Sequence, residues 1–272
     1  MADGRADAIS PLNPSRAASG VVAYLGRMAI LGCSAAGSLI FPARASGSLF
    51  SETTRQIDRL LAVGVPMMAL IHVGMGSFLA MQAYFGATFI DGIGPVVGVG
   101  LIRNLSPLLT GFFMAGLMAS RAVPEFRGRA HPPADAARMA AARMAAAMVA
   151  GPVLTAWGSL VGIAAGWAVA RSMMGVSLPA FFDLFLEMLW ARDIVGLAVK
   201  GAAFGMVAAL FGCQEGLSRA GSEDDPEADC SAAGRAACLA SLAILAINSG
   251  WFLLVYHAGS PFGPTVLAPP TR

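Results

Sequence analysis

The stretch GVGLIRNLSPLLTGFFMAG, residues 98–116, places Arg103 and Asn104 inside a segment that is otherwise apolar. No other formal charge occurs between Asp91 and Arg121. An ionisable side chain at mid-depth in a membrane costs at least about 2.5–3.5 kcal/mol, and such residues usually face a cavity or a partner. Two interpretations of Arg103 follow. It lines a polar pocket for an anionic headgroup, or it forms an internal pair with a carboxylate or a helix-end carbonyl.

The composition favours a polytopic, all-α membrane protein over a large soluble all-α domain. Of the 272 residues, 57% are apolar and 12% are charged, and the mean hydropathy is +0.68. Ordinary soluble domains carry roughly 25% charged residues. A soluble fold of this length has too few core positions for so much apolar surface.

Five apolar runs are long enough to cross a bilayer, which takes about 20 residues. The expected spans are 60–90, 92–120, 144–170, 194–213 and 236–256. Residues 177–190 are too short and too acidic to span, so we expect a surface helix with Asp183 and Glu187 on a solvated face. The permease domain is expected at 60–257, with cytoplasmic loops at 121–143 and 214–235 and a tail at 258–272.

Residues 1–16 are polar and proline-bearing and are expected to be flexible. Residues 17–59 follow as an apolar helix with its lead-in, interrupted by Arg27. Because Arg27 breaks the apolar core, the sequence favours a helix at the membrane interface. A signal peptide with a cleavage site at ARAS, residues 43–46, is the alternative.

Arginines indicate the orientation of the chain, because cytoplasmic segments of membrane proteins are enriched in basic residues. With a cytoplasmic N-terminus, thirteen arginines fall in inside segments and three in outside segments. The C-terminus then lies outside after five crossings.

Other features of the sequence predict structure rather than chemistry. Gly158, Gly162 and Gly166 recur every four residues, as do two glycine pairs in other spans, and this spacing indicates close helix packing. His72 is expected to pack between helices, with a proton-relay role as the alternative. The acidic run 222–229 is expected to be solvated, and the four cysteines reduced.

No P-loop, GxSxG or HExxH motif occurs in the sequence, and the cysteines and histidines have no metal-ligand spacing. We therefore expect no catalytic residue, cofactor or metal. The sequence therefore gives no sign of an enzyme.

Several ordered motifs resemble the MlaE/YrbE-type permeases, the membrane subunits of MCE-associated ABC lipid transporters. They occur in RQIDRLLAVGVPMMALIHVGMGSFLAMQAYFG (55–86), LIRNLSPLLTGFFMAG (101–116), ARDIVGLAVKGAAFG (191–205) and GRAAC (234–238). The positions that match the family's motifs include Arg55, Gln56, Gln82, Tyr84, Arg103, Pro107, Asp193 and Lys200. The resemblance covers about residues 20–257.

The resemblance implies a half-transporter of the inner membrane. It implies a dimer of permease subunits, two cytoplasmic ATPases, and transfer of phospholipid or another hydrophobic substrate between the membrane and an MCE-domain partner. The residues that it places on the lipid path are Tyr84, Arg103, Asn104 and Pro107, with Gln82 and Lys200 as further candidates. The residues that it places at the ATPase contact are Arg121, Glu125 and Arg127.

The chain departs from the family's pattern at three places. Asn104 replaces the acidic partner of the arginine, and Ser106 replaces a glycine, so an Arg-Asn pair leaves positive charge that favours an anionic ligand. The loop after the second span lacks the family's Glu-Gln and is shorter. Pro132 and Pro133 prevent one continuous helix there. A divergent subunit that pairs with a more typical permease is therefore an alternative.

Two other function classes remain open from the sequence. A secondary transporter would show an inverted repeat or broken helices at matching positions, and no internal repeat is evident. A lipid-modifying membrane enzyme would use Asp183, Glu187 or His257, but the sequence lacks a nucleophile–base signature. Lys200 lies about 9 Å from the outer end of its span, within reach of the interface.

Overall fold

The computed structural model describes residues 14–40, 46–86, 93–127, 132–220 and 225–257. These residues form helices and connecting turns, without a strand. The α-helices are α1 (Pro14–Ile40), α2 (Ser46–Gly86), α3 (Ile93–Gly100), α4 (Ser106–Arg127), α5 (Pro133–Met174), α6 (Leu178–Met188), α7 (Ala191–Ser218) and α8 (Pro226–Phe252). Two short π-helices are η2 (Leu101–Leu105) and η3 (Leu253–His257). The protein is therefore an all-α polytopic membrane protein, as the composition predicts.

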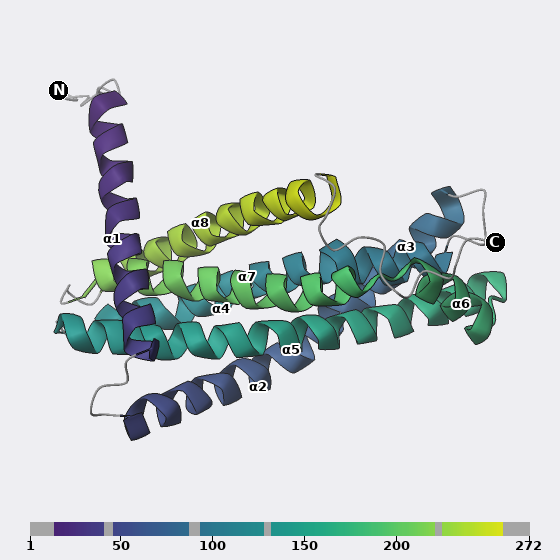
Figure 1. Ribbon diagram of the computed structural model, residues 1–272, viewed down its shortest axis with the longest axis horizontal. Helices are drawn as coiled ribbons and strands as arrows, with labels where there is room; N and C mark the ends of the chain where they lie inside the picture. Colours follow the sequence, from purple (N-terminus) through teal and green to yellow (C-terminus); the bar gives the residue numbers. More distant parts are fainter. Residues whose placement is uncertain (1–13, 41–45, 87–92, 128–131, 221–224, 258–272) are drawn as a thin grey trace, which may run out of the picture.

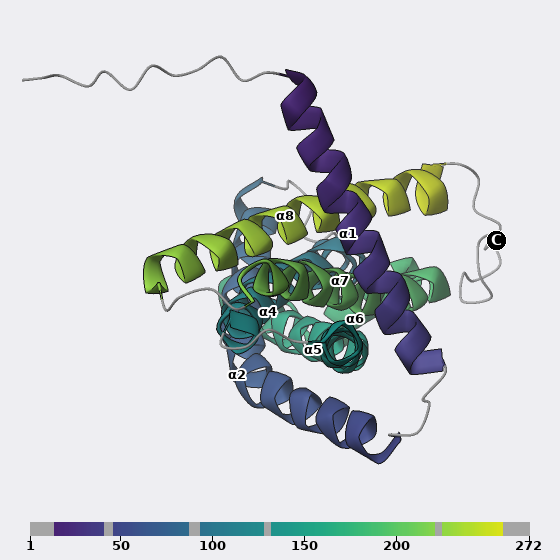
Figure 2. The same ribbon diagram turned by 90° about the vertical axis from the view of Figure 1, so that its left-hand side faces the viewer.

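The long helices form a bundle in which α4, α5 and α7 run in a similar direction and α2 and α8 lie obliquely beside them (Figures 1 and 2). α5 packs against both α2 and α7, and α4 packs against α7 and α8. At one end of the bundle, which we call the basic end, lie Arg121, Arg127, Arg138, Arg143, Arg219 and Arg235. The opposite end carries α3 and α6, and we call it the α6 end (Figure 1).

Six described helices are long and apolar enough to cross a membrane, one more than the five spans expected from the sequence. The additional one is the 20–40 part of α1. Both views show α1 lying across the basic end of the bundle, at a steep angle to the other helices (Figures 1 and 2). It packs there against the start of α5 and the end of α7. The steep angle of α1 to the bundle is the one expected of a helix at the membrane interface, and its place there stays a prediction.

The helices also extend well beyond the expected spans. α5 has 42 residues, which is about 63 Å of helix, roughly twice the hydrocarbon thickness of a bilayer. A helix of this length extends beyond the hydrocarbon region. The expected cytoplasmic loop at 121–143 takes in the last turns of α4 and the first turns of α5, and its side of the membrane stays a prediction. The predicted break is confirmed, because α4 ends at Arg127 and Pro132 caps the start of α5.

Close backbone approach between helices explains the glycine spacing. A Cβ atom on Gly76 of α2 would lie 1.9 Å from the carbonyl oxygen of Gly162 in α5, which is impossible without moving a helix. Between α5 and α7, a Cβ on Gly151 would lie 2.2 Å from the Gly201 carbonyl oxygen. The buried ring of His72 occupies the space beside Gly158, and its Nδ1 lies 2.9 Å from the Met68 carbonyl oxygen. The predicted close packing is confirmed.

α6 is a short helix that covers α3 at the α6 end. The hydroxyl of Ser177 accepts a hydrogen bond from the Ala180 N–H at its start, at 3.3 Å. Phe181 and Phe185 are buried on the side that faces α3. Asp183 and Glu187 are exposed on the other side, as expected. α6 is therefore an amphipathic helix that anchors the start of the second span.

The acidic run 222–229 agrees in part with its prediction as solvated: Asp225 and Glu227 are exposed, Asp229 is not, and residues 222–224 lie outside the described residues. α7 continues to Ser218, and α8 begins at Pro226. The Asp225 side chain caps α8 by accepting hydrogen bonds from the N–H groups of Glu227 and Ala228. Asp229 is 9% exposed and pairs with Arg127 and Arg219. These carboxylates order the basic end instead of only being solvated.

We predict that Gly76→Ala lowers the free energy of unfolding by about 1–3 kcal/mol, because the added methyl group overpacks the α2–α5 contact. Thermal unfolding of the purified protein in detergent measures the loss. Gly74→Ala is the matched control, since nothing lies within 4 Å of its added Cβ. Equal melting temperatures for the two variants would contradict the close packing.

Because α1 lies across the bundle, we predict that the two chain ends lie on opposite sides of the membrane. Two reporters test this when each is fused in turn to each chain end. One is a fluorescent protein that matures only inside the cell, and the other is an alkaline phosphatase that is active only outside. Each reporter should work at one end alone. A reporter active at both ends would show that α1 crosses the membrane as a sixth span.

Candidate functional site

The second span is interrupted at Arg103 by a π-helical turn. The N–H of Ser106 bonds to the carbonyl oxygen of Leu101, five residues back rather than four. Pro107 follows and has no N–H, so the carbonyl of Arg103 lacks its ordinary α-helical donor. Wider turns of this kind are frequent at functional sites. The structure shows how this freed carbonyl is used.

Arg103 forms a two-pronged ion pair with Asp193 in the first turn of α7. Arg103 Nε donates to Asp193 Oδ1 at 3.0 Å, and Nη2 donates to Oδ2 at 2.9 Å. The backbone N–H of Trp190 donates a third hydrogen bond to Oδ2, at 3.1 Å. The Asp193 side chain is fully buried, whereas 28% of the Arg103 side chain is exposed. The carboxylate also lies at a helix N-terminus, where the helix dipole favours negative charge.

Lys200 supplies the missing donor to the Arg103 carbonyl. Its ammonium group hydrogen-bonds to that oxygen and lies 3.4 Å from Asn248 Oδ1. Lys200 is the single lysine among the 18 basic residues of the sequence, and it is 2% exposed. The expectation that it reaches the interface is therefore wrong, because its position on α7 turns it toward α4 and α8. A compact ammonium fits this space, where a planar guanidinium would need more room.

Asn104 connects the same region to α8. The side-chain amide of Asn248 donates to Asn104 Oδ1 at 2.8 Å. Hydrogen bonds therefore link the second, fourth and fifth expected spans at one level of the bundle. We call this group the Arg103 cluster, and it consists of Arg103, Asn104, Asp193, Lys200 and Asn248.

The Arg103 cluster holds two cationic side chains against one carboxylate. Burying charge is costly unless it is paired, and the fork between Arg103 and Asp193 satisfies this condition. The excess positive charge and the partial exposure of Arg103 suit the binding of an anionic group. The interpretation of Arg103 as an internal pair is confirmed by its contact with Asp193, and its role in a headgroup pocket stays a prediction.

The structure brings together some of the predicted lipid-path residues but not all. Arg103, Asn104 and Lys200 meet in the Arg103 cluster, and Pro107 is buried in the turn that follows. Gln82 and Tyr84 lie exposed near the C-terminal end of α2, where Tyr84 packs edge-on against Phe85 at 4.9 Å between ring centroids. Neither side chain takes part in the hydrogen bonds of the cluster.

The predicted ATPase-contact residues each tie the end of α4 to a different helix. Arg121 donates to the carbonyl oxygen of Arg59 in α2 at 3.2 Å. Glu125 forms an ion pair with Arg143 of α5, and Arg127 pairs with Asp229 of α8. Movement at the end of α4 would therefore be transmitted to three neighbouring helices, α2, α5 and α8.

Two members of the Arg103 cluster were not among the residues predicted to bind substrate. Asp193 was noted only as a motif match, although an acidic residue at the start of an apolar span was a usable signal. Asn248 was not noted, because an amide in a span carries no formal charge. Its position within an apolar run was the only signal in the sequence.

The fold and the Arg103 cluster define a multi-pass helical membrane protein with a charged group held inside its bundle. Sequence comparison gives the particular family. The family described as "Permease MlaE" matches residues 53–126 and 134–253, well over half of the chain. The protein belongs to the MlaE permease family and is an ABC transporter permease subunit.

Similar proteins in other organisms carry corresponding names. A probable ABC transporter permease protein of Synechocystis is 28% identical over 183 residues, which cover 61% of this chain and 69% of the relative. One of Rickettsia conorii is 25% identical over 176 residues, covering 59% and 68%. The chloroplastic protein TRIGALACTOSYLDIACYLGLYCEROL 1 of Arabidopsis thaliana is 25% identical over 183 residues, covering 62% and 52%.

We predict that Asp193→Asn lowers the free energy of unfolding by about 3–5 kcal/mol, because it leaves the Arg103 guanidinium without its charge partner. Thermal unfolding in detergent measures this. Asp183→Asn makes the same chemical change at an exposed position on α6 and is the control. Its free energy of unfolding should stay within about 0.5 kcal/mol of that of the unchanged protein. A similar stability for both variants would mean that the ion pair does not compensate Arg103.

Proposed function

We propose that this permease subunit moves lipid, phospholipid or another hydrophobic substrate, between the inner membrane and an MCE-domain partner. The observation that carries the proposal is the Arg103 cluster, found within a chain of the MlaE permease family. Arg103 is partly exposed on a bundle that faces lipid. A permease for a small soluble solute would not need a cationic group there. The name of the Arabidopsis relative, which is that of a glycolipid, supports a lipid substrate.

The charge of the Arg103 cluster indicates the kind of lipid. Two cations face one carboxylate, and Asn104 adds no negative charge where the family's pattern has glutamate. A lipid with an anionic headgroup would bring the missing negative charge. We propose Arg103 and Lys200 as the groups that favour it, with Tyr84 and Gln82, exposed near the C-terminal end of α2, as further lipid contacts.

The basic end is the proposed docking side for cytoplasmic ATPase subunits. Arg121, Glu125 and Arg127 lie there, and their bonds to α2, α5 and α8 would carry a movement of the ATPase into the bundle. The N-terminus is then cytoplasmic, in agreement with the excess of arginine at this end. A dimer of permease subunits, formed with a second copy or with a related subunit, completes the proposed transporter.

We predict that Asn104→Glu reduces the anionic lipid that co-purifies with the protein several-fold, because the new carboxylate neutralises the excess positive charge. Lipid mass spectrometry of the detergent-purified protein measures the retained lipid. Asn104→Gln is the matched control, since glutamine has the same size as glutamate but no charge. Its side-chain oxygen can still accept the hydrogen bond from Asn248. Equal lipid retention by the two variants would remove the headgroup role of the Arg103 cluster.

The ATPase partnership is tested by co-expression with the ATPase and MCE-domain proteins of the same organism. We expect both to co-purify with the permease, and lipid transfer in reconstituted vesicles to require ATP. Glu125→Ala should weaken co-purification of the ATPase, while Glu187→Ala at the α6 end should leave it unchanged. Failure of every ATPase to co-purify would contradict the proposal.

A further inference from the structure

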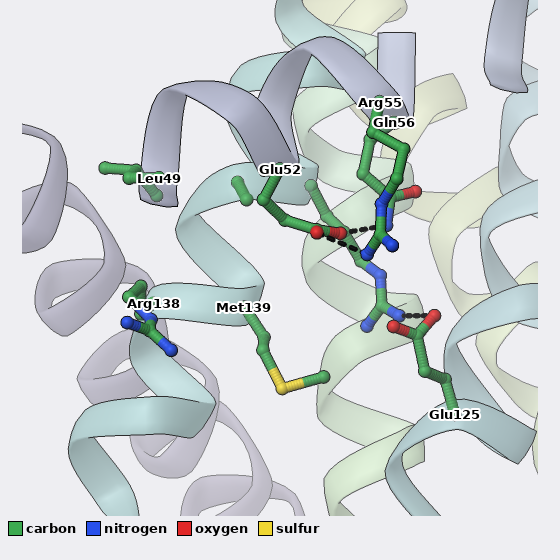
Figure 3. A pocket seen from close by; sticks show the side chains of 9 residues that line it. Leu49, Glu52, Arg55, Gln56, Glu125, Arg138 and Met139 are labelled. Atoms are coloured by element: carbon green, nitrogen blue, oxygen red, sulfur yellow. Dashed lines mark hydrogen bonds and ion pairs between the residues drawn. The ribbon is translucent and has the colours of Figure 1, made fainter. Parts of the chain in front are cut away.

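A second charged cavity lies at the basic end, on the far side of the bundle from α6. It has a volume of about 290 Å³, and we call it the basic-end cavity. It lies between the first turns of α2, the end of α4 and the early turns of α5 (Figure 3). Its walls are Leu49, Glu52, Arg55, Gln56, Glu125, Arg138, Met139, Ala142 and Arg143. Glycerophosphate, the polar part of a phospholipid, is smaller than this volume.

Arg143 gives this cavity a buried donor. Its side chain is 3% exposed, and its guanidinium pairs with Glu125 and lies 4.7 Å from the centre of the Phe126 ring. The thiol of Cys213 lies close enough to interact with the guanidinium, but within the described part of the chain no oxygen accepts a hydrogen bond from its buried Nη1. Buried polar groups are nearly always satisfied, so a buried donor that lines a cavity indicates a bound ion or water.

The other charged side chains around the cavity determine whether it favours a negatively or a positively charged ligand. The lining itself holds three guanidinium groups and two carboxylates, and Arg138 also pairs with Asp135 of its own helix, at 3.7 Å on the exposed side. Glu52 already accepts hydrogen bonds from Arg55 and from Gln56, the latter at 2.8 Å, and Glu125 pairs with Arg143. Arg138 lies across the cavity from Arg55 and Glu125 (Figure 3). With both carboxylates engaged by neighbours, the lining favours an anion.

The position of the cavity matches the headgroup layer of a bilayer. Arg143 directly precedes the uncharged stretch 144–170, so it lies where the hydrocarbon region ends. Leu49, Met139 and Ala142 supply an apolar side to the same cavity. Arginine binds phosphate with a planar pair of donors, which makes it suited to this group.

We propose that the basic-end cavity binds a phosphate group through Arg143 and Arg138. The group comes from the headgroup of an anionic lipid or from free phosphate. This site is separate from the Arg103 cluster, which lies toward the other end of the bundle, and the proposal does not depend on transport. A lipid bound here would stay with the permease and connect α2, α4 and α5 where the ATPase is proposed to dock.

The experiment uses the purified full-length protein in nanodiscs of phosphatidylcholine with added phosphatidylglycerol, and separately in detergent with inorganic phosphate. Native mass spectrometry counts bound lipid, and thermal unfolding reports phosphate binding. The variants are Arg138→Gln, whose side chain is half-exposed, and the double change Arg143→Gln with Glu125→Gln, which removes a buried pair together. Arg27→Gln, an exposed arginine on α1 at the same end, is the matched control.

For a lipid headgroup, we expect phosphatidylglycerol to bind and both cavity variants to weaken it about tenfold or more, the effect of losing a charged hydrogen bond. Arg27→Gln should leave it unchanged. For free phosphate, we expect a rise in melting temperature that the cavity variants abolish. Binding that is equal in all variants, or weakened equally by Arg27→Gln, would overturn the site. Lipid held by the Arg103 cluster is a constant background, because no variant alters it.

Discussion

The ion pair between Arg103 and Asp193 is the interaction on which the interior of this permease depends. A guanidinium in a low-dielectric region needs a partner that is itself held in place. Asp193 meets this need because it is fully buried, accepts the Trp190 N–H, and lies in the first turn of α7. The pair also fixes α7 against the second span, so that Lys200 reaches the carbonyl left by Pro107.

Charge is distributed differently at the two levels of the bundle. The Arg103 cluster uses few groups that are deeply placed, and hydrogen bonds connect them across three helices. The basic end uses many arginines, most of them paired with a carboxylate or a carbonyl of another helix, whereas Arg138 pairs within α5. Between these levels the helices approach through glycine, so that backbone contact replaces side-chain packing where lipid offers no hydrophobic drive. Polar contacts at the Arg103 cluster and at the basic end therefore hold the permease together, along with close backbone packing between its helices.

The sequence predicted those features that depend on local signals. The length of the apolar runs predicted the spans. Pro132 and Pro133 predicted the break before α5, and the glycine spacing predicted the close contacts between helices. The Arg103–Asp193 and Asn104–Asn248 contacts join residues 90 and 144 positions apart, and a single sequence does not show such pairing. Lys200 was misplaced for a related reason. Its depth along the helix was known, but the face of α7 that points into the bundle was not.

The interior position of Asp229 was missed because acidic residues in a run resemble a solvated loop. Two arginines from other segments, Arg127 and Arg219, draw this carboxylate inward. The expected surface helix at 177–190 and its exposed acidic face were correct, since amphipathic spacing alone determines them. Membership of the MlaE permease family agrees with the resemblance found from the motifs.

The π-turn at 101–105 has a consequence for how this chain tolerates change in length. A π-turn holds one residue more than the α-helix it interrupts, and each residue turns an α-helix by about 100°. A π-turn spreads almost the same rotation over its extra residue, so α3 and α4 stay nearly in phase, and deleting one residue would restore a regular helix without rotating them. Adding a residue with no second π-turn would rotate α3 relative to α4 by about 100°. Either Gly94 would then leave its contact with α6, or Arg103 would point away from Asp193, so this segment tolerates the loss of one residue better than the gain of one.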